Sequence, residues 1–209
     1  MKEILCEPGA GKTALAWSIR THFLDKSARV HDKYRDEYYD PPAWYWRPEA
    51  TQGTRGPVYS HASHDYDLLT WLCGPIERVF VYGGTYLLDP GDVADGFTVS
   101  LRFASGAVAT VSTPWVTRVE YDFVGVATQG LTVANQNGSL KVRRANQAVE
   151  EEVTFENPDM WVPMATHFLR CIQDNTSPLV SAADGYRAIC VADAAHRSLS
   201  EGREVVVSA

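Results

Sequence analysis

The stretch Phe97-Thr98-Val99-Ser100-Leu101-Arg102-Phe103 decides the fold class of this chain. Its apolar and polar residues alternate with a period of two, which is typical of a β-strand that packs one face on a core and leaves the other face more polar. Similar segments surround it, and turn-forming residues separate them at short intervals. The pattern predicts a meandering antiparallel sheet. The other strands predicted for this sheet are Arg78–Tyr82, Ala107–Pro114, Tyr121–Ala127, Leu131–Ala134, Ser139–Arg143 and Ala148–Phe155.

Helical periodicity appears before and after these strands. The expected helices are Thr13–Leu24, a helix through Leu72 that Gly74-Pro75 stops, Pro163–Asp174, and a last helix that Ser181 and Asp184 cap and Gly202 ends. We therefore predict an α+β protein with a meandering antiparallel sheet, one face of which is covered while the other is more polar. Residues 1–26 are expected to form a residual N-terminal strand, loop and helix, with the strand at 1–6. Residues 27–209 are expected to form a single α+β sheet domain.

Composition narrows the class of partner. The chain has 209 residues, of which 45% are hydrophobic, enough for one domain with a substantial core. Its net charge of −7 has no basic block, so nucleic acid and anionic membranes are not expected partners. Small molecules or other proteins fit better. No run approaches the ~18 apolar residues of a membrane span, and we expect a cytoplasmic protein with four reduced, buried cysteines.

Imidazoles and carboxylates cluster at the start of the helix that ends near Leu72. His64 and Asp67 stand three residues apart, and His61 and Asp65 stand four apart. A carboxylate one helical turn from an imidazole can fix its tautomer and raise its basicity, which suits a general acid or base near neutral pH. The candidate catalytic residues are His64, His61 and Asp67. A histidine at a helix start can also cap or pack, and an acid in a first turn is expected from the helix dipole.

Two other ligand sites are considered. His61, His64 and Asp67 are residue types that bind zinc or manganese, but steps of three drift around a helix, so no metal site is predicted. Residues 8–13 resemble a phosphate-binding loop, yet Cys6 stands where that loop needs glycine, so we interpret the match as coincidental.

An aromatic, proline-rich loop precedes the helix. Trp46 and Arg47 in this loop are candidate substrate-binding residues, because aromatic faces stack on sugar rings and arginine bridges hydroxyl or carboxylate groups. The aromatic residues of the loop could equally cover a sheet edge.

Three stretches resemble the Gfo/Idh/MocA family of nicotinamide-dependent sugar and polyol dehydrogenases. The first is Trp46-Arg47 with Gly53 and Gly56, followed by His64 to Gly74, which is similar to the glycine turn and His-x-x-Asp helix of the family. The others are 103–111, similar to its sheet hairpin, and 178–188 with the Gly202 ending, similar to its terminal helix and strand. The resemblance implies the carboxy-terminal domain of the family, covering roughly residue 13 to the end. The fold class that it implies is α+β: an open, mostly antiparallel sheet with helices packed on one face and no Rossmann domain.

The chain also departs from the family pattern. No GxGxxG motif follows a strand, so the nucleotide-binding domain that the resemblance implies is almost entirely missing. Cys6-Glu7-Pro8 resembles the Cys-Glu-Lys-Pro signature without its lysine, the family's catalytic proton donor. Ser60 stands where the family usually has an aspartate. His64 and Asp67 carry over by position, and Lys12 is a candidate to replace the missing lysine at the substrate.

These observations leave three functional hypotheses. The first is a Gfo/Idh/MocA-like domain acting on a sugar, polyol or related small molecule, unable to bind NAD(P) alone unless a partner supplies a nucleotide domain. The second is a cofactor-independent lyase, isomerase or cyclase that uses a histidine acid/base in the former dehydrogenase pocket. The third is a non-catalytic oligomerisation or accessory subunit. The resemblance also implies a homo-oligomer that associates through the sheet face.

Overall fold

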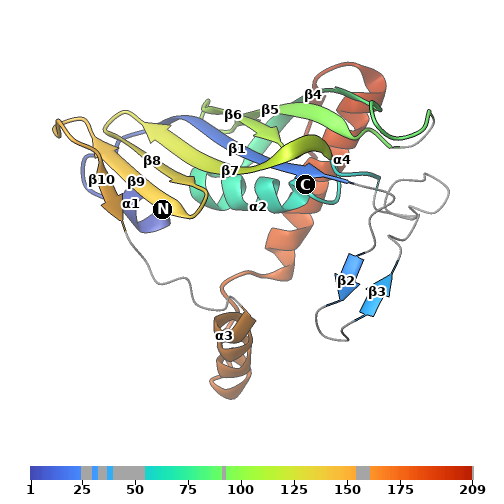
Figure 1. The fold of residues 1–209 in the computed structure, drawn as a ribbon. Coiled ribbons are helices and arrows are strands. Elements are labelled where there is room, and N and C mark those ends of the chain that lie inside the picture. Colours follow the sequence, from blue (N-terminus) through green and yellow to red (C-terminus); the bar gives the residue numbers. More distant parts are fainter. Residues whose placement is uncertain (25–29, 33–36, 40–54, 91–92, 154–160, 209) are drawn as a thin grey trace.

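A nine-stranded sheet dominates the computed structural model, which describes residues 1–24, 30–32, 37–39, 55–90, 93–153 and 161–208. Its strand order is β10-β9-β8-β7-β1-β6-β5-β4-β11 (Figure 1). Neighbouring strands are antiparallel except for β1 and β6, which run parallel. The strands of this sheet are β1 Thr13–Phe23, β4 Ile76–Gly84, β5 Gly96–Phe103, β6 Val108–Ser112, β7 Val116–Thr128, β8 Leu131–Gln136, β9 Ser139–Arg144, β10 Glu151–Val153 and β11 Val205–Val206. The predicted α+β class is confirmed.

The helices α2 (Ala62–Cys73) and α4 (Ala182–Glu201) pack against each other and on one face of the sheet. The core lies between them and the strands. In β5 the residues Val99, Leu101 and Phe103 face it, so the alternation predicted from the sequence is confirmed. On α2, Tyr66 and Leu69 are fully buried against the same core. The remaining elements are α1 (Lys2–Leu5), α3 (Trp161–Gln173) and a small hairpin of β2 (Val30–Asp32) and β3 (Glu37–Tyr39).

Two element types predicted for the amino-terminal 26 residues are wrong. The expected strand at 1–6 is the short helix α1, and the expected helix at 13–24 is the strand β1. β1 has apolar residues on both faces: Ala16 points to the helices, while Leu15, Trp17 and Ile19 point to the opposite side. Because apolar residues lie on both faces of β1, the alternation that marks a strand with one polar face is lost. Residues 13–23 are part of the main sheet, not an appendage to it.

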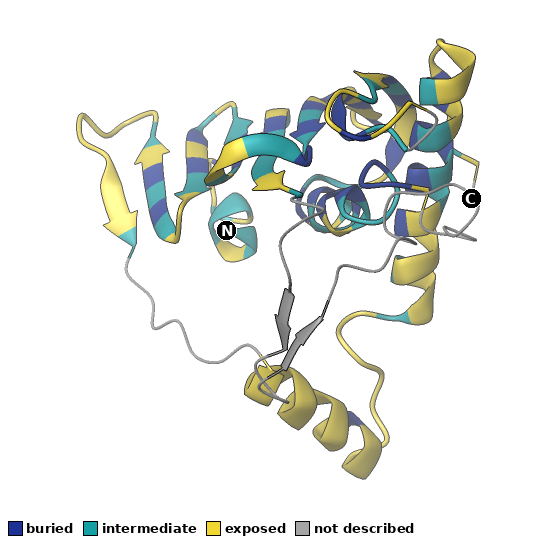
Figure 2. Ribbon diagram, turned by 45° about the vertical axis from the view of Figure 1, so that its right-hand side comes forward, coloured by how far each residue is buried: buried dark blue, intermediate teal, exposed yellow. Residues whose placement is uncertain are grey.

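Both helices predicted near the carboxy terminus are present, but only α4 packs on the sheet. The cap of α4 is confirmed: the Ser181 hydroxyl accepts a hydrogen bond from the Asp184 backbone N–H, the Asp184 carboxylate accepts one from Ser181 N, and Gly202 ends the helix at φ +65°. α3 also exists, but its apolar stripe faces solvent (Figure 2). Met164, Phe168, Leu169 and Ile172 are each 58–63% exposed.

Two remaining expectations concern membranes and cysteines. No helix in the described part of the chain is long and apolar enough to cross a bilayer. All four cysteines are free thiols, but Cys6 is exposed, so the expectation that all are buried is wrong.

Gly125 on β7 makes room for the ring of Trp17 on β1. A Cβ atom added at Gly125 would lie 2.1 Å from that ring. We expect Gly125→Ala to lower the free energy of unfolding by about 1–3 kcal/mol, because a rigid aromatic ring must shift. Urea denaturation measures the change. Gly185→Ala is the matched control: nothing lies near its Cβ position on α4, and it should stabilise the protein by about 1 kcal/mol. Equal effects of the two substitutions would contradict the packing argument.

Candidate functional site

The amino-terminal turn of α2 is held by a compact turn at residues 56–60. Gly56 has φ +75°, and its carbonyl accepts hydrogen bonds from the backbone N–H groups of Tyr59 and Ser60 and from the Ser60 hydroxyl. The Tyr66 hydroxyl donates to the Val58 carbonyl at 3.0 Å, which ties the helix back to this turn. His61 occupies the N-cap position. The first turn of α2 is therefore fixed in position, although no side chain caps it.

Asp65 anchors this turn to β1. Its Oδ1 atom accepts hydrogen bonds from Ser18 Oγ at 2.5 Å and from Arg20 Nε and Nη2 at 2.8 and 2.6 Å. The carboxylate is fully buried, and its Oδ2 atom has no hydrogen-bond partner. Burial raises the pKa of Asp65, and the Arg20 guanidinium and the Ser18 hydroxyl oppose that rise. The Oδ1 atom of Asp65 is thus bonded to β1 and not to His61, the neighbour that the sequence spacing suggested.

His61 lies beside His22 of β1 and Trp115, which precedes β7. Trp115 Nε1 donates a 2.8 Å hydrogen bond to His61 Nδ1, and the two rings meet edge to face with centroids 5.2 Å apart. The His22 ring centroid is 6.1 Å from that of His61. Burial, followed by the nearby His22, His64 and Arg20, lowers the pKa of His61 to about 4. His61 is therefore uncharged at neutral pH.

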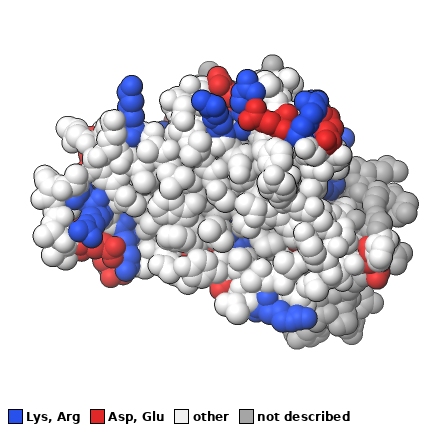
Figure 3. All heavy atoms as spheres, turned by 90° about the horizontal axis from the view of Figure 1, so that it is seen from above, with Lys and Arg blue, Asp and Glu red and all other residues white. Residues whose placement is uncertain are grey.

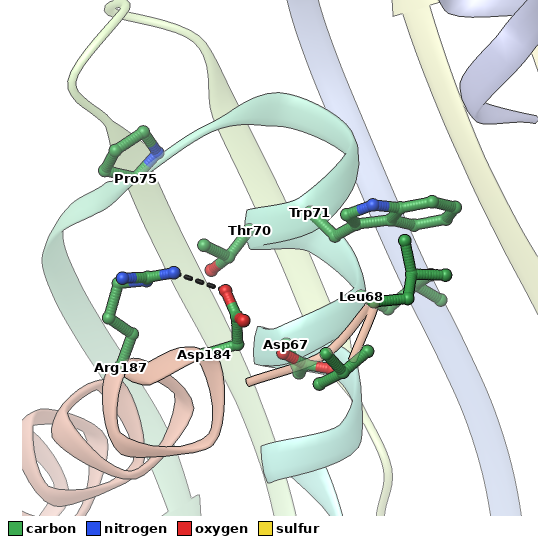
Figure 4. Close-up of a pocket in the computed structure, with 9 residues that line it drawn as sticks. Asp67, Leu68, Thr70, Trp71, Pro75, Asp184 and Arg187 are labelled. Carbon is green, nitrogen blue, oxygen red and sulfur yellow. Dashed lines mark hydrogen bonds and ion pairs between the residues drawn. The ribbon is translucent and has the colours of Figure 1, made fainter. Parts of the chain in front are cut away.

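His64 and Asp67 point progressively further from the buried side of the helix. At about 100° per residue, Asp67 is about 200° around α2 from the buried Asp65. His64 is exposed. Asp67 lines a cavity of about 550 Å³ between α2 and the start of α4 (Figure 4). The cavity is lined by Asp67, Leu68, Thr70, Trp71, Pro75, Leu179, Val180, Asp184 and Arg187. His61 thus packs toward β1 and Trp115, and Asp67 faces the cavity on the opposite side of α2. His64 is exposed between them, about 60° around the helix from His61.

Of the other predicted site residues, Lys12 is described, and it is not brought to this place. Lys12 precedes β1, where its backbone N–H donates to Gln129 Oε1. Arg20, which belongs to the site, is near the other end of this strand. Seven residues of extended chain from Thr13 to Arg20 span about 23 Å, so Lys12 is far from the site. Trp46 and Arg47 lie outside the described residues. The loop before Thr13 leads into a strand, whereas a phosphate-binding loop leads into a helix, which agrees with the interpretation of residues 8–13 as a coincidental match.

Sequence reasoning missed Ser18, Arg20, His22 and Trp115 as members of the site. One signal was available: Asp65 shares the helix face of Ala62, Leu69 and Leu72, where a charge requires a partner. Within the described residues, no group of three or more His, Cys, Asp or Glu side chains could hold a metal ion.

The region that contains this site matches a protein-family model. The model for the GFO/IDH/MocA C-terminal domain matches residues 19–141, more than half of the chain. The chain belongs to the Gfo/Idh/MocA family. The match includes α2, His61, His64, Asp65, Asp67 and Trp115, and Lys12 lies outside it. No curated protein sequence matches the chain significantly.

Solved structures of Gfo/Idh/MocA-type oxidoreductases share the fold. A levoglucosan dehydrogenase in complex with NADH is similar over 99% of this chain and 62% of its own, with 19% identity and a TM-score of 0.80. A putative NADPH-dependent oxidoreductase from Desulfitobacterium hafniense is 20% identical, with a TM-score of 0.79 over 99% of this chain and 60% of its own. The WlbA dehydrogenase from Bordetella pertussis, in complex with NADH and UDP-GlcNAcA, is 17% identical, with a TM-score of 0.69 over 100% and 59%. This chain spans about three fifths of these proteins.

The lowered pKa of His61 predicts a pH-dependent stability. The unfolded imidazole takes up a proton near pH 6.5, while the folded one does so near 4, so its stabilising contribution is complete above 6.5 and is lost as the pH falls toward 4. We expect the urea midpoint of the wild type to fall more than that of His61→Gln between about pH 7 and about pH 4.5. His64→Gln, at an exposed position of the same turn, is the control and should behave like the wild type. Parallel pH profiles for wild type and His61→Gln would contradict the assignment.

Proposed function

We propose that this domain binds a sugar or polyol at the amino-terminal turn of α2 and transfers protons there through His64. The observation that carries the proposal is the anchoring of this turn: Asp65, bonded to Ser18 and Arg20, holds His61 and His64 in fixed positions at the sheet. The side chain of Arg20 is still 30% exposed, so it can also approach a ligand. His64 is open to solvent and can exchange a proton with a bound hydroxyl group.

The substrate class rests on the fold neighbours. Structures with this fold include levoglucosan dehydrogenase with levoglucosan, the same enzyme with L-sorbose, and the WlbA dehydrogenase with UDP-GlcNAcA. All three ligands are carbohydrates or carry one. A sugar or polyol is therefore the proposed substrate class of this chain.

The described residues do not fit a nicotinamide dinucleotide. A dinucleotide site needs a strand, a glycine-rich turn and a helix whose amino terminus meets the pyrophosphate. Here Gly9 and Gly11 are followed by β1, and the carbonyl of Gly9 packs where a Cβ of Gly130 would stand. We therefore propose that NAD(P) binds only if a partner supplies the nucleotide domain, and we assign this chain proton transfer alone.

A cofactor-independent lyase, isomerase or cyclase is the second candidate. It is favoured by the neutral state of His61 beside an exposed His64, because abstraction of a proton next to a carbonyl needs a base and a nearby hydrogen-bond donor but no hydride acceptor.

We expect purified protein to leave the fluorescence of NADH and NADPH unchanged, and to give saturation-transfer NMR signals with levoglucosan or L-sorbose. His64→Ala should weaken the sugar signals, while Thr132→Ala on the far side of the sheet should not. Binding of NADH by the chain alone would contradict the assignment of proton transfer alone, and absence of any sugar signal would contradict the substrate class. Deuterium incorporation next to the carbonyl of L-sorbose in D2O, abolished in His64→Ala, would favour the second candidate.

We also propose that the chain forms a homo-oligomer through the face of the sheet opposite α2. Leu15, Trp17 and Ile19 of β1 and Tyr121 and Phe123 of β7 lie on this face. Figure 3 shows that charged side chains gather toward its edges and leave the middle largely uncharged. Apolar surface of this kind is typical of an interface between protein chains.

Light scattering during gel filtration tests this interface. The wild type should have a mass above the 23.2 kDa of one chain, and Leu15→Lys should shift it toward that value, because two copies of a buried lysine would face an apolar partner surface. Val149→Lys, an exposed position outside this face, should leave the mass unchanged. A wild-type mass of one chain would exclude the homo-oligomer.

A further inference from the structure

Trp115 holds one nitrogen of His61 and so determines where the proton of this ring lies. The indole Nε1–H group can only donate a hydrogen bond, and it donates to His61 Nδ1 at 2.8 Å. Nδ1 must therefore carry the lone pair. Since a neutral imidazole has one proton, that proton is on Nε2. The opposite tautomer would set two N–H groups against each other and leave the buried indole N–H without its acceptor.

The position of Trp115 is itself fixed on several sides. Its side chain is 3% exposed and packs on Leu88, with Leu24 and Val93 beside it. Its backbone N–H donates to the Asp95 carbonyl at 2.8 Å, and its carbonyl accepts from Leu24 N at 3.0 Å. The donor that selects the tautomer of His61 is thus part of the folded framework.

The groups around His61 keep the ring uncharged. His22 and Arg20 face it from β1, and His64 stands one turn along α2; each disfavours a second proton on the ring. Asp65 is the nearby carboxylate on α2, but its bonded oxygen is already committed to Ser18 and Arg20. His61 is partly exposed, and among the described residues its ring makes one hydrogen bond, through Nδ1, so no described side chain accepts the Nε2 proton. A neutral N–H donor is therefore left available on this ring.

We propose that His61 donates a hydrogen bond from Nε2 to an oxygen atom of the carbohydrate, and that Trp115 is the positioning residue that sets this tautomer. The inference rests on the proposed function and gives His61 a different role from the base considered from the sequence, because a protonated Nε2 cannot accept a proton. His64, three residues further along α2, remains the proton acceptor. Side chains at this spacing are about 5–6 Å apart at Cβ, so donor and acceptor can meet neighbouring oxygens of one sugar.

Nitrogen NMR of histidine-labelled full-length protein tests the assignment directly. His61, assigned by its loss in His61→Gln, should show a pyridine-type Nδ1 and a pyrrole-type Nε2 at pH 7. It should remain neutral when the pH is lowered to about 6.5, the pKa of an unperturbed imidazole. Trp115→Phe keeps an aromatic ring but removes the N–H donor. This variant should shift His61 toward a mixture of tautomers and raise its pKa. An Nδ1–H tautomer or an imidazolium at pH 7 in the wild type would overturn the proposal, and this measurement decides the tautomer even if Trp115→Phe does not fold.

Addition of L-sorbose then tests the contact with the substrate. The Nε2 resonance of His61 should shift in the wild type, and the effect should shrink in Trp115→Phe. Val149→Lys, at an exposed position outside the site and the proposed interface, is the control and should respond like the wild type. A sugar that shifts His64 but leaves Nε2 of His61 unchanged overturns the donor role alone. A set of sugars to which neither histidine responds overturns the proposed function together with this role.

Discussion

The buried carboxylate of Asp65 is the constraint on which the site depends. A charge removed from water is strongly destabilising unless hydrogen bonds and an opposite charge replace its hydration. Ser18 and Arg20 supply both, and they come from alternate positions of one strand, so the carboxylate can be satisfied in one register of α2 against β1. The pair therefore contributes specificity of position more than net stability. It fixes where His61 and His64 stand relative to the sheet.

The side chains of α2 meet different surroundings on different sides of the helix. The buried side carries Asp65 among apolar residues, and the N-terminal edge presents His61 to Trp115. The outward side carries His64 and Asp67, with a cavity beyond Asp67 that reaches α4. Residues that are neighbours in the sequence thus meet different electrostatic environments, because each step along a helix rotates the side chain by about 100°.

Local patterns predicted the parts of the fold that local forces determine. The alternation in β5 and the cap formed by Ser181 and Asp184 are examples, since each depends on residues within a few positions. The identity of β1 was missed, because apolar residues lie on both of its faces and do not alternate with polar ones. In the site, His61 and His64 could be found from their spacing, but their environments could not. Ser18 lies 47 positions from Asp65, and Trp115 lies 54 from His61, so these partners are joined by topology that no local pattern contains.

The parallel pairing of β1 with β6 has a consequence for synthesis of the chain. Leu15 pairs with Val108, which is 93 positions later, and the other neighbour of β1, β7, comes later still. At typical rates of translation, β1 waits roughly 5–20 s before either neighbour has been made. During that time a strand with Leu15, Trp17 and Ile19 on one side and Ala16 on the other has both edges unpaired, a state that favours aggregation. Folding of the site is consequently a late event, because α2 can find its buried ion pair only where β1 has joined the sheet.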